Sequence, residues 1–123
     1  HLKETEGQAK RLIEALDMLS APKGKEKVEG IRGIIKDGEW ILKNIKDPAA
    51  RDSMLIGAAQ YVEHYEMAGY ATAIQLANEL GEDNVAALLE ETLAEEESTS
   101  ETLTSLAPTI IGEVANPDED EEE

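Results

Sequence analysis

Apolar residues recur at intervals of three and four along most of the chain, which is the spacing of one face of an α-helix. Loop signals interrupt this pattern, so the sequence predicts several helices joined by short links. We expect four helices over about residues 1–20, 25–46, 48–80 and 83–106, the last ending before Pro108. The sequence therefore predicts an all-α fold, an antiparallel helical bundle with long third and fourth helices.

The boundaries of the third expected helix carry strong local signals. Asp47 can cap the first-turn amides, and Pro48 at the first helical position sacrifices no intrahelical hydrogen bond. Gly81 is placed to end the helix, because glycine readily adopts the left-handed conformation of a C-terminal cap. Since the link after Gly81 is short, the third and fourth helices are expected to be antiparallel neighbours.

Glutamates stand in the apolar faces of these two helices, where leucine would be expected. At about 100° per residue, the face of the third helix includes Glu63 and Glu66, and that of the fourth includes Glu96. Glu66 precedes Gly81 by as many residues as Glu96 follows it, which places both roughly 22 Å from the turn. Because an unpaired buried carboxylate is costly, something must compensate these charges. The predicted inner faces comprise Leu2, Thr5, Ala9, Leu12, Leu16 and Leu19; Leu55, Ala59, Val62, Glu63, Glu66, Tyr70, Ala73, Ala77 and Leu80; and Val85, Leu88, Leu89, Thr92, Glu96, Thr99, Leu103 and Leu106.

Composition excludes several classes of function. The 123 residues include 11 Lys and Arg against 28 Asp and Glu, a formal charge of −17, which argues against nucleic-acid and acidic-membrane surfaces. Without cysteine, any metal must be bound by oxygen or imidazole. There is no serine-nucleophile motif and no glycine-rich phosphate loop after a strand. No apolar run approaches the roughly 20 residues of a membrane span, so we expect a cytoplasmic protein.

The chain is expected to form one helical domain over residues 1–107. Residues 108–123 are expected to be an acidic C-terminal tail, partly disordered, because the last six residues are all acidic. Ile110 and Ile111 are the residues of this tail that can still pack on the bundle.

Glu63 and Glu66 form a Glu-x-x-Glu pair whose side chains point to similar sides, as carboxylates that bridge two cations must. Pairing with Lys, Arg or Tyr across the bundle is the alternative interpretation. On the fourth helix we prefer Glu96, although a small rotation would favour Glu95, and Glu97 should face solvent. Since no histidine follows three residues after either candidate, the site is oxygen-rich, which suits Mn, Mg or Ca as well as iron, or an empty site.

Three neighbouring residues of the third helix invite functional interpretations. His64 lies about 100° from Glu63 and off the apolar face. We therefore expect it to lie at the surface, to contact metal-ligating residues without binding the metal, or to lie at a subunit interface. Tyr65 also points off this face and is a candidate for the same interface. Tyr70 lies one turn beyond Glu66 on the inner face, where its hydroxyl can hydrogen-bond a carboxylate.

Several segments, in order, resemble the YciF-like bacterial stress proteins, a branch of the ferritin-like superfamily. They are HLKETEGQ, EGIRGIIKDGEW, DSMLIGAAQYVEHYEMAGY, LANELG and LLEETLAEEE, of which VEHYEMAGY is the most specific. The resemblance covers about Leu2 to Ala107. It implies a ferritin-like helical bundle, a homodimer, and a carboxylate site for two iron or manganese ions between the long helices. It also implies another long, ligand-bearing helix before the HLxET motif, which this sequence lacks.

The HLxET motif adds candidate ligands from the first helix. His1 and Glu4 are one turn apart and match the motif, so they join Glu63, Glu66 and Glu96 as candidate metal ligands. Glu4 lies beyond the margin of the apolar face of its helix, and the alternative is a frayed terminus with a solvated glutamate.

Two functions follow from these observations. The first is a stress-associated protein with a carboxylate-rich di-metal site, of iron or manganese, that carries out peroxide or oxygen chemistry. The second is a non-catalytic structural or assembly protein without bound metal, whose buried glutamates are neutralised by protonation or by Arg and Lys. The sequence leaves open whether the chain is an enzyme.

Overall fold

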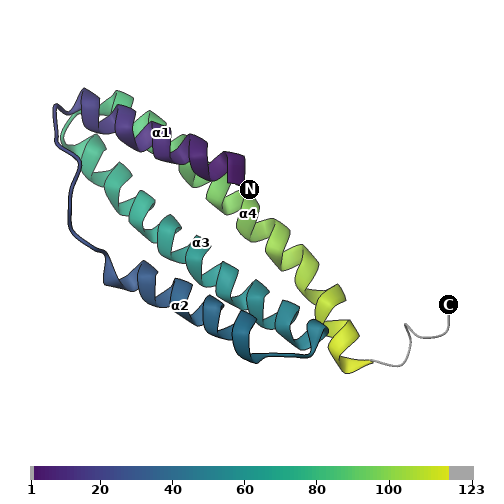
Figure 1. The fold of residues 1–123 in the computed structure, drawn as a ribbon. Coiled ribbons are helices and arrows are strands. Elements are labelled where there is room, and N and C mark those ends of the chain that lie inside the picture. The colour runs from purple at the N-terminus through teal and green to yellow at the C-terminus, as the bar shows by residue number, and fades with distance from the viewer. Residues whose placement is uncertain (1, 117–123) are drawn as a thin grey trace. The chain divides into compact units, whose positions relative to one another are not determined.

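The computed structural model describes residues 2–116, most of which form four α-helices (Figure 1). These are α1 (Leu2–Met18), α2 (Glu29–Asn44), α3 (Pro48–Glu79) and α4 (Asp83–Ala115). Residues 2–116 contain no strand. The predicted all-α fold with long third and fourth helices is therefore confirmed. None of the four helices combines the length and the apolar content that a bilayer-spanning helix requires.

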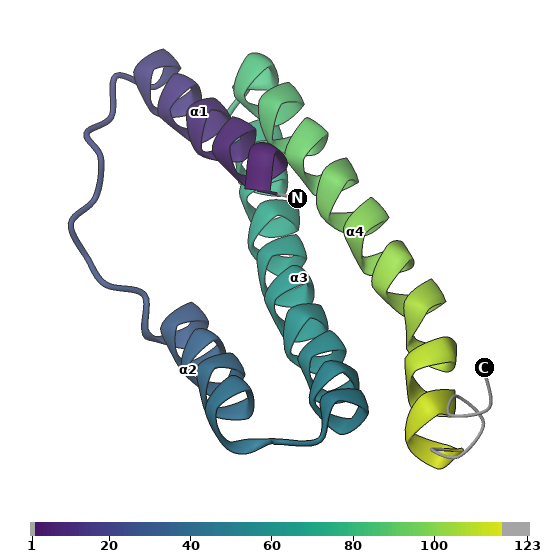
Figure 2. The same cartoon turned by 45° about the vertical axis from the view of Figure 1, so that its right-hand side comes forward.

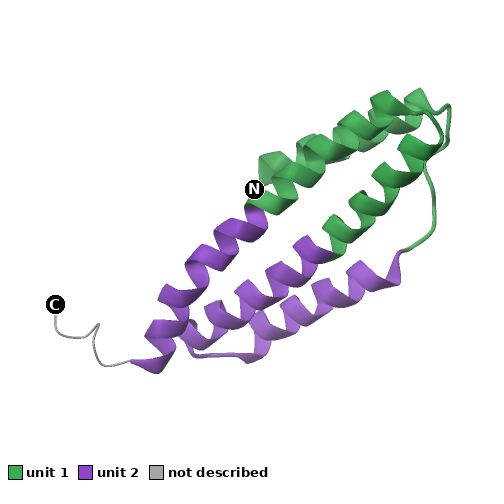
Figure 3. Cartoon of the chain, turned by 180° about the vertical axis from the view of Figure 1, so that it is seen from behind, with its two compact units in different colours: residues 1–27, 65–98 green, residues 28–64, 99–123 purple. Residues whose placement is uncertain are grey.

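The chain divides into two compact units, each assembled from separate segments (Figure 3). Unit 1 comprises His1–Lys27 and Tyr65–Ser98, which include α1, the second half of α3 and the first half of α4. Unit 2 comprises Val28–His64 and Thr99–Glu123, which include α2 and the remaining parts of α3 and α4. The two long helices therefore contribute to both units.

In unit 1, α1 and the end of α3 lie alongside the start of α4 (Figures 1 and 2). Gln8 of α1 contacts Glu96 of α4, and Arg11, later in α1, contacts Glu91, earlier in α4. These two helices are therefore antiparallel. Small and branched apolar side chains fill the core between the three helices. This core comprises Ala15, Ile74, Ala77, Val85, Ala86 and Leu89, with Tyr70, Ala73, Leu88 and Leu93 packed against it.

Both predicted boundaries of α3 are confirmed. Asp47 Oδ2 accepts a hydrogen bond of 2.8 Å from the Ala50 amide, which satisfies a first-turn donor. At the other end, Gly81 has φ = 73°, and the Glu82 amide donates to the Ala77 carbonyl at 2.8 Å. This bond belongs to the Schellman arrangement, in which a left-handed glycine ends the helix. The turn reverses the chain so that α4 begins beside the end of α3.

The predicted inner face of α1 turns toward α3 and α4 but is only partly buried. Gln8 and Ala15 are the buried residues of this helix, whereas Leu2, Leu12 and Leu19 are 73%, 42% and 43% exposed. Polar contacts to α4 orient the helix, and the leucine stripe instead lines an apolar groove of unit 1, whose volume is about 460 Å³. We call this depression the apolar groove. The sequence did not predict this orientation of α1. A helical-wheel projection counts apolar residues on one helix and does not include the carboxylates of the helix that it packs against.

The predicted end of the fourth helix is also wrong, because α4 continues to Ala115 with Pro108 inside it. A proline in a helix removes one backbone hydrogen bond and costs about 3 kcal/mol. Leu103, Ala107 and Ile110 are partly buried and stand at helical intervals on both sides of the proline. Their continued packing favours one helix over a break at this point.

The remaining differences from the predicted elements are smaller. α2 begins at Glu29, not near residue 25, and its N-cap residue Val28 provides no side-chain hydrogen bond. Leu80 and Leu106, which were placed on inner faces, are 75% and 48% exposed. The six acidic residues at the end of the predicted tail lie outside the described residues.

We expect Gly81→Ala to lower the free energy of unfolding by about 1 kcal/mol, because a β-carbon disfavours the left-handed conformation. Urea unfolding followed by circular dichroism measures the change. Gly33→Ala is the matched control, since Gly33 lies within α2 and an added β-carbon would meet no atom within 4 Å there. It should raise stability by up to about 1 kcal/mol. Equal effects of the two substitutions would contradict the assigned role of Gly81.

Candidate metal centre

Glu66 of α3 and Glu96 of α4 meet inside unit 1, as their equal separation from Gly81 predicts. A carboxylate oxygen of Glu66 lies within 4.8 Å of a carboxylate oxygen of Glu96. The Glu96 side chain is 1% exposed, and the two carboxyl groups form a hydrogen bond. Two carboxylates cannot share such a bond without a proton, so this pair holds one negative charge fewer than two free glutamates.

The pKa of Glu66 is raised from its ordinary value to about 8. Burial is the largest cause, followed by the hydrogen bond to Glu96 and the negative charge of Glu96. At neutral pH the Glu66–Glu96 pair therefore shares a proton. The shared proton lowers the repulsion between the two groups, which is also what a cation between them would do.

Glu63 stands one helical turn before Glu66 in the same continuous helix and is 3% exposed. One of its carboxylate oxygens lies within 4.8 Å of an oxygen of Glu66. The helix itself sets this proximity, because residues three apart lie on neighbouring turns of one face. We refer to Glu63, Glu66 and Glu96 as the carboxylate cluster. Three of the predicted ligands thus form one group of acidic side chains.

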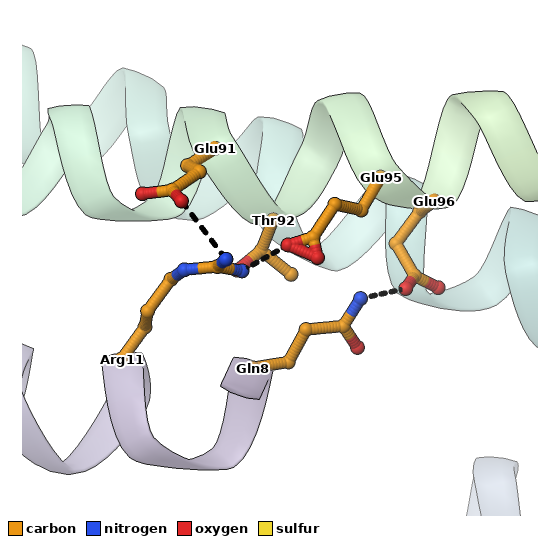
Figure 4. Close-up of polar contacts among 6 residues, drawn as sticks. All are labelled: Gln8, Arg11, Glu91, Thr92, Glu95 and Glu96. Atoms are coloured by element: carbon orange, nitrogen blue, oxygen red, sulfur yellow. Dashed lines mark hydrogen bonds and ion pairs between the residues drawn. The ribbon is translucent and has the colours of Figure 1, made fainter. Parts of the chain in front are cut away.

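Helix α1 places a neutral side chain against Glu96 (Figure 4). Gln8 is 6% exposed, and its Nε2 donates to Glu96 Oε1 at 2.5 Å. The sequence interpretation assigned no role to Gln8, which lies at the edge of the predicted apolar face of α1. Its one signal is its place in the HLKETEGQ segment, a turn after Glu4.

Arg11 distinguishes the two adjacent glutamates of α4 (Figure 4). Its Nη1 donates to Glu95 and, at 3.2 Å, to Thr92 Oγ1, while its Nη2 donates to Glu91 at 2.9 Å. Glu95 is therefore held in an ion pair with α1, and Glu96 belongs to the carboxylate cluster. The preference for Glu96 over Glu95 agrees with this arrangement.

The other tyrosine and histidine candidates lie where their helical positions predict. Tyr70 packs against the core of unit 1, and burial, followed by the charges of Glu66 and Glu96, raises its pKa. His64 is exposed in unit 2, where its Nε2 lies 3.5 Å from Ser100 Oγ, and it is not part of the carboxylate cluster. The predicted hydrogen bond from Tyr70 to a carboxylate stays a prediction.

Of the two candidate ligands from the HLxET motif, Glu4 lies within the described part of the chain. Glu4 is exposed on α1 and does not belong to the group formed by the other three glutamates. His1 lies outside the described residues. Their assignment as ligands therefore stays a prediction.

The donor set of the cluster fits a hard divalent cation. It consists of carboxylate oxygens, which Mg²⁺, Ca²⁺ and Mn²⁺ prefer and which also bind Fe²⁺. Two of the three side chains are almost completely buried, so a bound ion would be shielded from water on those sides. The arrangement can hold a cation in place of the shared proton.

In the presence of a chelator, we expect the stability of the chain to fall as pH rises from about 4.5 to about 8. Glu66 has a folded-state pKa of about 8, above its ordinary value, so its contribution is fully present below about pH 4.5 and is lost above pH 8. Glu66→Gln should flatten this dependence, because the amide does not ionise.

The measurement is urea unfolding at closely spaced pH values between 5 and 9, in buffers of constant ionic strength. Glu97→Gln is the matched control, because Glu97 is exposed on the same helix as Glu96 and should leave the pH dependence unchanged. Identical pH dependences for wild type and Glu66→Gln would show that Glu66 does not carry the effect.

Residues 1–116 match the family described as Domain of unknown function (DUF892). Protein YciF of Escherichia coli (strain K12) is 42% identical over 108 residues, 87% of this chain and 65% of that protein. The crystal structure of the E. coli stress protein YciF has a TM-score of 0.87 and 37% identity, covering 91% of this chain and 71% of that one.

The chain thus spans 65% of the length of its curated relative. The structural match confirms the predicted helical bundle. The sequence match confirms the predicted resemblance to YciF-like proteins. Because the family match extends over nearly the whole described chain, the protein belongs to the DUF892 family, which includes YciF-like proteins.

Proposed function

We propose that the chain is a ferritin-like, metal-handling protein whose carboxylate cluster binds divalent iron or manganese. The observation that supports this most directly is the pairing of Glu66 with Glu96 at a buried position on two different helices. Placing like charges together in a protein interior is unfavourable, and binding of cations is the common function that requires it. The stress-protein description of the E. coli relative is consistent with a role in managing reactive metals or peroxide.

Each part of the proposed site has a distinct task. Glu63 and Glu66 present two carboxylates from one helix, and Glu96 presents a third from its antiparallel neighbour. The packed side chains of unit 1, Tyr70 among them, limit access of water to Glu66 and Glu96. Bound iron or manganese would supply the redox chemistry for a reaction with peroxide or dioxygen.

A second candidate function is a non-catalytic assembly role without metal. It is supported by the shared proton of Glu66 and Glu96, which already reduces their repulsion. It is also supported by Arg11, which forms ion pairs with both Glu91 and Glu95 of α4. In this case the polar groups of the interior stabilise and orient the helices, and the cluster needs no ion.

Titration of the purified chain with Mn(II), and with Fe(II) under anaerobic conditions, distinguishes these functions. We expect saturable binding by isothermal calorimetry, and a thermal stabilisation that reaches about 2.7 kcal/mol when the free ion is at 100 times Kd. The double substitution Glu66→Gln with Glu96→Gln should weaken binding at least about 10-fold, because it removes the charges of the central pair.

Glu97→Gln is the matched control. It also replaces a glutamate of α4 with glutamine, but at an exposed residue, so the affinity for the metal ion should stay unchanged. Binding below about 0.1 equivalent of either ion, with no rise in Tm, would overturn the metal-handling proposal. In that event, unchanged or higher stability of Glu66→Gln would support the assembly role.

We also propose that the chain forms a homodimer through the apolar groove of unit 1. The groove is bordered by side chains that remain substantially exposed, such as Leu12 and Ile13 of α1, at 42% and 52%. An apolar surface of this kind is a common site of protein association. A second copy would cover leucines that the described chain leaves in contact with water.

Light scattering coupled to gel filtration measures the oligomeric state. The wild-type chain should have twice the mass of 13.4 kDa, and Ile13→Asp should shift the population toward the monomer by placing a charge in the groove. Val28→Asp is the control, because Val28 is similarly exposed, at 53%, and does not line the groove. A wild-type mass of 13.4 kDa at every concentration would rule out the dimer.

A further inference from the structure

We propose that Gln8 is a specificity-determining residue of the metal site, in which its amide oxygen becomes a neutral ligand contributed by α1. This inference rests on the proposed function of the carboxylate cluster. It assigns to Gln8 the role that the sequence resemblance gives to His1 and Glu4. It also predicts which metals the site prefers.

The first support is the position of the Gln8 side chain. It is the buried polar side chain of α1, at 6% exposure, and it extends from that helix directly to Glu96 (Figure 4). An amide in a protein interior must be hydrogen-bonded or otherwise compensated to avoid a cost of about 1–3 kcal/mol. Its contact with Glu96 Oε1 at 2.5 Å places the terminal group of Gln8 within reach of a cation bound by that glutamate.

The second support is the chemistry of the amide group. The nitrogen of Gln8 donates to a carboxylate oxygen of Glu96. A half-turn about the last side-chain bond exchanges the nitrogen and the oxygen without moving α1. The oxygen then faces the position that a cation takes between the carboxylates, where amide carbonyls are ordinary ligands of Mg²⁺, Ca²⁺ and Mn²⁺.

The third support is that the neighbouring side chain, Arg11, is already engaged in other contacts. Arg11, one turn after Gln8, is engaged with Glu91, Thr92 and Glu95, so it does not fill the space at Glu96 that Gln8 occupies. Glu4, one turn before Gln8, is exposed. Gln8 is thus a residue of α1 whose side chain donates directly to the carboxylate cluster.

A neutral oxygen donor in this position has consequences for metal preference. With Gln8, the proposed site has oxygen ligands from three helices and no imidazole. Such a ligand set favours Mn(II) and Mg(II) over the metals that prefer nitrogen ligands. A histidine at the same position would add a nitrogen ligand and shift the preference toward Co(II) and Zn(II). A glutamate would keep an oxygen ligand and add a negative charge.

Calorimetric titration of Mn(II) and Zn(II) into wild type, Gln8→Leu, Gln8→Glu and Gln8→His tests the inference. We expect Gln8→Leu to weaken Mn(II) binding about 10-fold and Gln8→Glu to bind Mn(II) at least as tightly as wild type. Gln8→His should raise the affinity for Zn(II) relative to Mn(II). It should also change the visible absorption spectrum of bound Co(II), because a nitrogen replaces an oxygen in the coordination sphere.

Circular dichroism in chelator verifies that each variant is folded before titration. If Gln8→Leu binds Mn(II) as tightly as wild type, or if Gln8→Glu weakens binding as much as Gln8→Leu, Gln8 is not an oxygen ligand. Those outcomes leave the carboxylate cluster as a metal site, provided that the Glu66 and Glu96 double variant loses binding. Failure of the wild-type chain to bind any of the ions overturns both proposals.

Discussion

The close approach of Glu66 and Glu96 is the constraint on which the rest of unit 1 depends. Two carboxyl groups within 4.8 Å, one of them almost fully buried, can coexist only if a proton or a cation reduces their charge. The raised pKa of Glu66 shows the first solution at neutral pH. Because the Gly81 turn sets equal distances to both residues, their meeting follows from helix geometry and cannot be relieved by sliding one helix without repacking the core.

The orientation of α1 follows from the same excess of negative charge on α4. Arg11 makes three polar contacts with α4, and Gln8 makes one. Turning the leucine stripe fully inward would bury more apolar area, but Leu12 and Leu19 already lose more than half of their exposure. In the orientation that these polar contacts hold, Leu12, Leu16 and Leu19 line the apolar groove.

The sequence was sufficient for the features that depend on periodicity and on local turn chemistry. Helical spacing and the Asp47 and Gly81 boundaries predicted α3, and counting outward from Gly81 predicted the meeting of Glu66 and Glu96. It was insufficient where a feature depends on the partner surface. The contacts of Gln8 become visible only when α4 is in place, and Pro108 remains helical because of packing on both sides of it.

The separation of Glu95 from Glu96 shows how neighbouring carboxylates acquire different roles. The two residues differ by about 100° around α4, and α1 meets them with different groups three residues apart. The charged guanidinium of Arg11 takes Glu95, whereas the neutral amide of Gln8 takes Glu96. Had these two side chains been exchanged, the arginine would neutralise the carboxylate cluster permanently, as a fixed cation. The observed order leaves the charge of the Glu66–Glu96 pair to a mobile proton or a bound ion instead of a fixed cation.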